Sequence, residues 1–133
     1  MVEAIKDLFN KTVPYYVYVI SPGKMEWQGL PFLKIGVTRD ITRRLQELQP
    51  LCPAKLEVIR LVGPMRRNDA FQLEASLKQD LKAHRTNGGG EWYNVPLADV
   101  VDPIDVMIAV VKGDTTNPKA AQIIGMLNEG KAR

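Results

Sequence analysis

The chain has little of what builds a zinc site or a disulfide. Its 133 residues include one cysteine, Cys52, and one histidine, His84. A single cysteine excludes an internal disulfide, and a structural zinc site draws its ligands from a Cys and His cluster. We therefore expect neither feature, and Cys52 is interpreted as a small apolar residue near a loop.

Long apolar runs are also missing. No stretch approaches the roughly 18–20 residues of a membrane-spanning helix, and the N-terminal MVEAIKDLFNK carries charges where a secretion signal needs an apolar core. Hydrophobic residues make up 45% of the chain and charged residues 25%, as in ordinary globular domains. We expect a cytoplasmic protein with a single domain, since this length suits one hydrophobic core.

The excess of positive charge is small and unevenly distributed. The net charge is +3 and the pI is about 9.1, which is compatible with a polyanionic partner but does not require one. Basic residues gather in the middle of the chain, which favours a surface that follows phosphates over scattered, solvated helix faces. These residues are Arg39, Arg43, Arg44, Arg66, Arg67, Lys78, Lys82 and Arg85.

The hydrophobic pattern predicts an α+β chain. Aromatic and β-branched runs, separated by a loop over 21–31 and closed by a turn at Gly63-Pro64, predict strands over 15–20, 32–37 and 55–62. Residues 91–95 are a short strand or an ordered tail. Helices are expected over 2–10, 41–49, 70–85, 102–113 and 117–130. Thr38 or Asp40 would cap the second of these helices, and Asn68 or Asp69 would cap the third. The last two helices begin with the N-cap and proline pairs Asp102-Pro103 and Asn117-Pro118.

Strand periodicity places polar side chains on one face of a hairpin. Side chains alternate along a strand, so Tyr16 and Tyr18 share a face of the first strand, and Lys34 and Gly36 share a face of the second. Burying an unpaired cation is costly, so Lys34 is expected to reach a partner or a cleft. A tyrosine hydroxyl across the antiparallel hairpin is the natural candidate.

Helical spacing separates two adjacent arginines. Ile41, Leu45 and Leu48 form one apolar stripe at about 100° per residue. Arg44 falls beside this stripe and Arg43 falls almost opposite to it. We therefore expect Arg44 at the margin of the sheet that this helix covers, and Arg43 in solvent.

The long helix also places two ionisable residues near its apolar stripe. Glu74 falls at the edge of the stripe and His84 falls inside it; the stripe is Ala70, Leu73, Leu77 and Leu81. A carboxylate in such a place is more often paired with a lysine or arginine than bound to metal, and both interpretations stay open for Glu74. A histidine at a helix end is more often hydrogen-bonded than catalytic.

The order and spacing of these residues resemble the GIY-YIG nuclease superfamily. The motif positions are Tyr16-Val17-Tyr18, Lys34-Ile35-Gly36, Arg44 and Glu74, with Arg44 eight residues after the motif glycine. A second motif reading K-I-G and the later Gly90-Glu91-Trp92-Tyr93 are similar to the phage and bacterial branch of the superfamily. The resemblance covers about residues 15–95.

The resemblance implies a small three-stranded antiparallel sheet flanked by helices. The two C-terminal helices, expected from their own start signals, are appended to it. The resemblance also implies a DNA endonuclease that hydrolyses phosphodiester bonds with Mg²⁺ or Mn²⁺. By similarity, Tyr18 positions or activates the water, Arg44 binds the phosphate, and Glu74 holds one divalent metal. Lys34 replaces the tyrosine of the second motif, and a cation there would favour the phenolate of Tyr18.

Three further candidates accompany these catalytic residues. Tyr16 stands where the first motif has glycine, His84 ends the long helix, and Asn87 competes with Asn94 for the role of an asparagine found in many members. Contacts with DNA are expected from Arg39, Arg43, Lys78 and Arg85.

Two other functions remain open. One is a non-catalytic DNA-binding module on the same fold, which would keep the arginines but would not need Tyr18 and Glu74 together. The other is a protein-interaction domain that forms a homodimer through its C-terminal helices. The joint presence of Tyr18 and Glu74 favours the enzyme.

Overall fold

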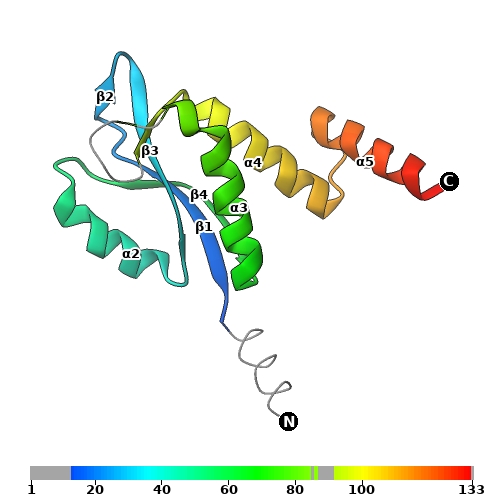
Figure 1. The fold of residues 1–133 in the computed structure, drawn as a ribbon, viewed down its shortest axis with the longest axis horizontal. Helices are drawn as coiled ribbons and strands as arrows, with labels where there is room; N and C mark the ends of the chain where they lie inside the picture. The colour runs from blue at the N-terminus through cyan, green and yellow to red at the C-terminus, as the bar shows by residue number, and fades with distance from the viewer. Residues whose placement is uncertain (1–12, 85, 87–91, 133) are drawn as a thin grey trace, which may run out of the picture. The chain divides into compact units, whose positions relative to one another are not determined.

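The computed structural model describes residues 13–84, 86 and 92–132 (Figure 1). The chain divides into two compact units, Met1–Pro96 and Leu97–Arg133, and each is described by itself. The boundary falls between the expected core and the expected helical extension. The helix expected over 2–10 lies outside the described residues, and the grouping of both units into one domain stays a prediction.

An antiparallel sheet forms the centre of the first unit, which confirms the α+β class. The long strands lie in the order β3, β1, β4; short β2 pairs with β3 at one place and short β5 pairs with it at another. The strands are β1 (Tyr15–Ser21), β2 (Glu26–Trp27), β3 (Leu30–Thr38), β4 (Glu57–Met65) and β5 (Trp92–Asn94). The sheet therefore has five strands, against three in the sheet that the resemblance implies. β5 lies in the segment 91–95, where a short strand was one of the two alternatives.

Two departures from the expected strands have local causes. β2 was not predicted, because it has only two residues and lies in a segment whose prolines and glycines indicate a loop. The predicted turn at Gly63-Pro64 is wrong, since β4 continues through it to Met65. β4 is the last strand in the sheet order, and a proline without an N–H is tolerated at such an edge.

Helices cover the two faces of this sheet (Figure 1). α2 (Ile41–Leu48) packs its Ile41, Leu45 and Leu48 against a buried cluster that contains Tyr18 and Ile20. α3 (Arg67–Asp80) lies against β1 and β3 on the other side. The short 3₁₀ turns η1 (Gln49–Leu51) and η2 (Lys82–His84) follow α2 and α3. Each face of β1 is thus buried by a different helix.

The start of α3 differs from the prediction. α3 begins at Arg67, and its N-cap is Arg66, which makes no capping hydrogen bond through its side chain. Asn68 and Asp69 therefore lie inside the first turn, where the negative charge of Asp69 interacts favourably with the positive end of the helix dipole. Asp69 thus stabilises the helix N-terminus from a position three residues after the N-cap.

The second unit is a pair of helices in contact, α4 (Leu97–Lys112) and α5 (Pro118–Ala132). α4 begins five residues before the predicted Asp102, because Leu97, Val100 and Val101 extend its apolar spacing past Pro103. The predicted start of α5 is confirmed, since Ala120 N donates to Asn117 Oδ1 at 3.1 Å. None of the helices in the described part of the chain has the length and apolar character that a bilayer crossing requires.

The N-cap of α2 is Asp40, as expected. Arg43 N donates to Asp40 Oδ1 at 3.1 Å. We expect Asp40→Ala to lower the free energy of unfolding by about 1 kcal/mol, because the first turn loses this acceptor. Chemical denaturation measures the change. Gln46→Ala, an exposed position on the same helix, is the control and should change stability by a few tenths of that; equal effects would contradict the capping role.

Candidate functional site

The site is organised by the close approach of Tyr18 to Gly36. The β1–β3 register pairs these two residues directly. A Cβ atom at Gly36 would overlap the hydroxyl, Cζ and Cε2 of Tyr18. The second motif therefore ends in glycine because the phenol ring lies across the backbone of β3. The ring itself is buried, with 1% of Tyr18 exposed.

Arg44 reaches the hydroxyl of Tyr18 from α2. Arg44 Nε donates a hydrogen bond to Tyr18 Oη at 3.2 Å. The Arg44 side chain is 37% exposed and Tyr18 is 1% exposed, so the guanidinium is the part of this pair that solvent and a ligand can reach. The hydrogen bond to Tyr18 is the main cause that raises the pKa of Arg44, against the opposing effect of burial. The predicted position of Arg44 at the margin of the sheet is confirmed.

A polar hollow of about 280 Å³ surrounds this arginine. Glu47 stands between two arginines: its Oε2 is 3.1 Å from Arg44 Nη1, and its Oε1 is 3.3 Å from Arg43 Nε. The Arg43 side chain is 78% exposed, as predicted for the solvent side of α2. We call this hollow the arginine hollow; it is lined by Thr38, Arg39, Asp40, Arg43, Arg44 and Glu47.

Sequence reasoning missed Glu47, although a signal for it was present. Glu47 follows Arg44 by three residues and Arg43 by four, and both spacings bring side chains together on a helix. Arg39 was expected on the DNA-binding surface; it is exposed in the same hollow, with its Cζ 6.0 Å from the centre of the Tyr15 ring. Three arginines thus share one hollow with two carboxylates.

Lys34 lies on the same face of the sheet as Tyr18, which confirms the prediction. The register pairs Lys34 with Ile20 on β1 and with Trp92 on β5. Only 9% of Lys34 is exposed, and its Nζ lies 5.6 Å from the centre of the Trp92 ring. An ammonium over an indole face gains electrostatic attraction, so this cation has an aromatic partner from the end of the domain. Tyr16 shares the face, half-buried and paired with Thr38.

Glu74 occupies the margin of the apolar stripe on α3, as predicted. Ala70 and Leu77 of the stripe are buried, while the side chains of Glu74 and Lys78 are each 19% exposed. Lys78 Nζ is 3.1 Å from Glu74 Oε1. Lys78, expected to contact DNA, therefore binds the candidate metal ligand. α2 and α3 cover different faces of the sheet. The structure therefore brings Tyr18, Lys34 and Arg44 together on the face that α2 covers. Glu74 lies on α3, which covers the opposite face.

The donor set suits one kind of metal better than others. Among the described residues, no group of three or more histidine, cysteine, aspartate or glutamate side chains is placed to hold an ion. A zinc or all-protein calcium site needs such a group. Mg²⁺ keeps several of its waters and binds through one or two carboxylates. Glu74 fits it as a single protein ligand if the ion replaces Lys78 at one carboxylate oxygen.

The remaining candidates separate into exposed, structural and undescribed residues. His84 is exposed in η2, so its predicted place inside the apolar stripe is wrong; α3 ends at Asp80 and the helical phase is lost. The Asn94 amide donates to the backbone carbonyls of Leu30 at 3.0 Å and Pro31 at 3.3 Å, which ties β5 to the start of β3. Arg85 and Asn87 lie outside the described residues.

The sequence also matches a known domain family. Residues 15–108, more than half of the chain, match the T5orf172 domain. The chain belongs to the T5orf172 domain family. No curated protein and no solved structure gave a significant match to it. The T5orf172 match begins at the first residue of β1 and ends within α4, so it includes the Tyr18–Arg44 contact and the Glu74–Lys78 pair.

Replacement of the motif glycine tests how the T5orf172 core holds its tyrosine. We expect Gly36→Ala to lower the free energy of unfolding by about 1–3 kcal/mol, because the added methyl group overlaps the Tyr18 phenol. Gly23→Ala is the matched control, since a Cβ there would lie 3.6 Å from Glu57 Oε2 in ordinary contact. Denaturant titration compares the variants, and equal stability would show that the ring can move aside at no cost.

Proposed function

We propose that this T5orf172 protein is a metal-dependent DNA endonuclease that hydrolyses phosphodiester bonds. The observation that carries the proposal is the hydrogen bond from Arg44 to the hydroxyl of Tyr18, at the boundary between the core and the arginine hollow. The domain family supports the proposal, because the T5orf172 domain is phage-associated and is found in an endonuclease-related context. The order of motif residues supports it as well.

Arg44 binds the phosphate in this mechanism. A guanidinium has five N–H donors in a planar fork, more than the contacts with Tyr18 and Glu47 use. Such a fork binds two phosphate oxygens at once and opposes the negative charge that builds in the transition state. The raised pKa of Arg44 keeps it cationic throughout.

Tyr18 positions or deprotonates the attacking water. Its oxygen accepts a hydrogen bond from Arg44, so it would lie close to a phosphate that Arg44 binds. Lys34 lies two residues from Gly36 on the same face of the sheet and adds a second positive charge to that face. The burial of the ring fixes the direction of this oxygen, so the group that positions the water is itself oriented before the reaction.

Glu74 would hold the metal. An Mg²⁺ or Mn²⁺ ion bound there would supply positive charge that opposes the negative charge developing on the phosphate. Glu74 would contribute to the site from α3, whereas Tyr18 and Arg44 contribute from β1 and α2. A non-catalytic DNA-binding module would keep the arginine hollow and have no use for Glu74.

Loss of the carboxylate should abolish cleavage without loss of the fold. We expect Glu74→Gln to reduce the Mg²⁺-dependent nicking of supercoiled plasmid at least 10²–10³-fold, on the order of the loss of a transition-state contact. Glutamine keeps the volume and one oxygen for Lys78. Gel assays with Mg²⁺ and with EDTA measure the rate, and circular dichroism checks the fold.

Two controls separate a metal ligand from an ordinary ion-pair partner. Lys78→Met breaks the same pair but leaves the carboxylate, so it should retain most of the cleavage rate. Asp80→Asn, an exposed carboxylate on the same helix, should behave as the unmodified protein does. Equal cleavage by Glu74→Gln and the unmodified protein would overturn the nuclease mechanism.

The two adjacent arginines of α2 provide a matched comparison. We expect Arg44→Ala to lower the cleavage rate by about 10²–10³-fold, because the phosphate loses its ligand and Tyr18 loses its hydrogen bond. Arg43→Ala removes an exposed charge and should cost only a small factor in DNA affinity. Single-turnover rates with a labelled duplex measure both. If the two variants lose the same rate, Arg44 does not touch the reacting phosphate.

A further inference from the structure

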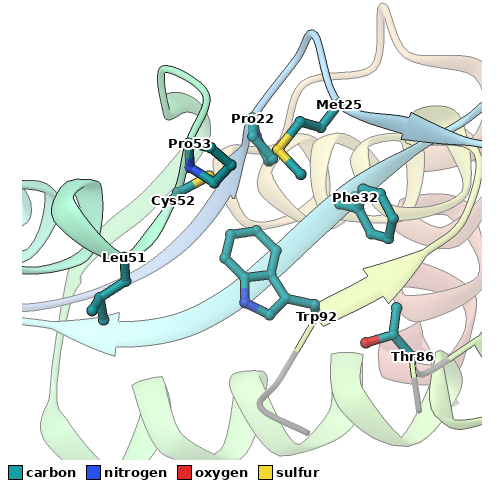
Figure 2. A pocket seen from close by; sticks show the side chains of 8 residues that line it. All are labelled: Pro22, Met25, Phe32, Leu51, Cys52, Pro53, Thr86 and Trp92. Carbon is teal, nitrogen blue, oxygen red and sulfur yellow. The ribbon is translucent and has the colours of Figure 1, made fainter. Parts of the chain in front are cut away.

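A second hollow, apolar in character, lies on the sheet face that carries Tyr18 and Lys34. Its volume is about 360 Å³, within the usual range of small-molecule sites. Figure 2 shows the Trp92 indole in its centre, with Leu51 and Cys52 on one side and Phe32 on the other. We call it the Trp92 pocket; Pro22, Met25, Pro53 and Thr86 complete its lining.

The register places this pocket on the catalytic face. Phe32, Lys34 and Gly36 alternate on one side of β3, and Trp92 pairs with Lys34. Gly36 stands opposite Tyr18, and Phe32 is four residues away, or about 14 Å at the usual rise of a strand. One DNA strand advances about 3.4 Å per stacked nucleotide, so a few nucleotides cover this span.

The charges around the pocket match a nucleic acid. The Lys34 ammonium lies 5.6 Å from the centre of the Trp92 ring and is almost buried, so a cation stands beside an aromatic wall. Arg44 lies further along the same face. An apolar peptide would use the aromatic wall but would gain nothing from the two cations, whereas a nucleotide brings a flat base and a phosphate together.

We propose that the Trp92 pocket binds an unpaired nucleobase of the DNA that is cut at Tyr18, an inference that rests on the proposed nuclease function. The base stacks on the indole of Trp92, and Phe32 lines the same space. The Thr86 hydroxyl is a hydrogen-bonding group at the wall of the pocket. A base inside a duplex has both faces stacked, so the substrate is single-stranded or carries a displaced base.

Binding without cleavage tests the pocket separately from the enzyme. In EDTA, fluorescence anisotropy compares a labelled single-stranded oligonucleotide with an abasic strand of the same length and charge. We expect the strand with bases to bind roughly tenfold more tightly, because the stacking of one base on an aromatic side chain gives a gain in affinity of about this size. Trp92→Leu should remove most of this preference, while Trp92→Phe should keep much of it.

Trp27→Leu is the matched control, because Trp27 is exposed on β2 and does not line the Trp92 pocket. It should leave the preference unchanged. A preference for bases that survives Trp92→Leu intact would overturn the proposal, and so would equal binding of the two strands by the unmodified protein. Equal binding together with plasmid cleavage would reject the pocket alone and leave the nuclease function standing.

Cys52 gives a second readout that needs no substitution. It is the one cysteine of the chain and it lines the Trp92 pocket, so a thiol reagent reports on access there. We expect the strand with bases to slow its modification several-fold and the abasic strand to leave it unchanged. An apolar peptide as the true occupant would leave Cys52 equally reactive with both strands, which would contradict a nucleobase site.

Discussion

The close contact between Tyr18 and the backbone of Gly36 is the constraint on which the candidate site depends. It requires the antiparallel pairing of β1 with β3, and it requires a residue without a side chain on β3. It also sets the position of the phenol oxygen, which accepts a hydrogen bond from Arg44 of α2. The core that folds the first unit and the geometry that would serve catalysis therefore rest on the same contact.

Each candidate catalytic charge already has a partner inside the protein. Arg44 shares Glu47 with Arg43, Lys34 lies over Trp92, and Glu74 binds Lys78. These partners reduce the cost of holding charges near a core, since an isolated buried charge is strongly disfavoured. In the proposed function, a phosphate or a metal would have to compete with, or share, one of these internal contacts. A surface that balances its charges in this way matches the small net charge of the whole chain.

Features set by neighbouring residues could be predicted from the sequence. The α+β class, the three long strands, the Asp40 cap and the different positions of Arg43 and Arg44 all follow from local periodicity. The start of α4 could not be predicted, because the apolar spacing of Leu97 and Val100 overrides the proline signal at 103. The contact of Lys34 with Trp92 depends on how β5 pairs with β3, and a single sequence does not show pairing between distant segments.

Glu47 has a thermodynamic role besides its charge. A free arginine side chain samples many rotamers, and fixing it costs conformational entropy on the order of 1.5–2 kcal/mol. The contacts of Arg44 with Tyr18 and Glu47 restrict these rotamers when the domain folds, before any ligand arrives. The ligand then meets a guanidinium that is already oriented, and less entropy is lost on association. In the proposed function, this carboxylate would weaken the overall attraction for DNA and make the arginine a more rigid receptor for one phosphate.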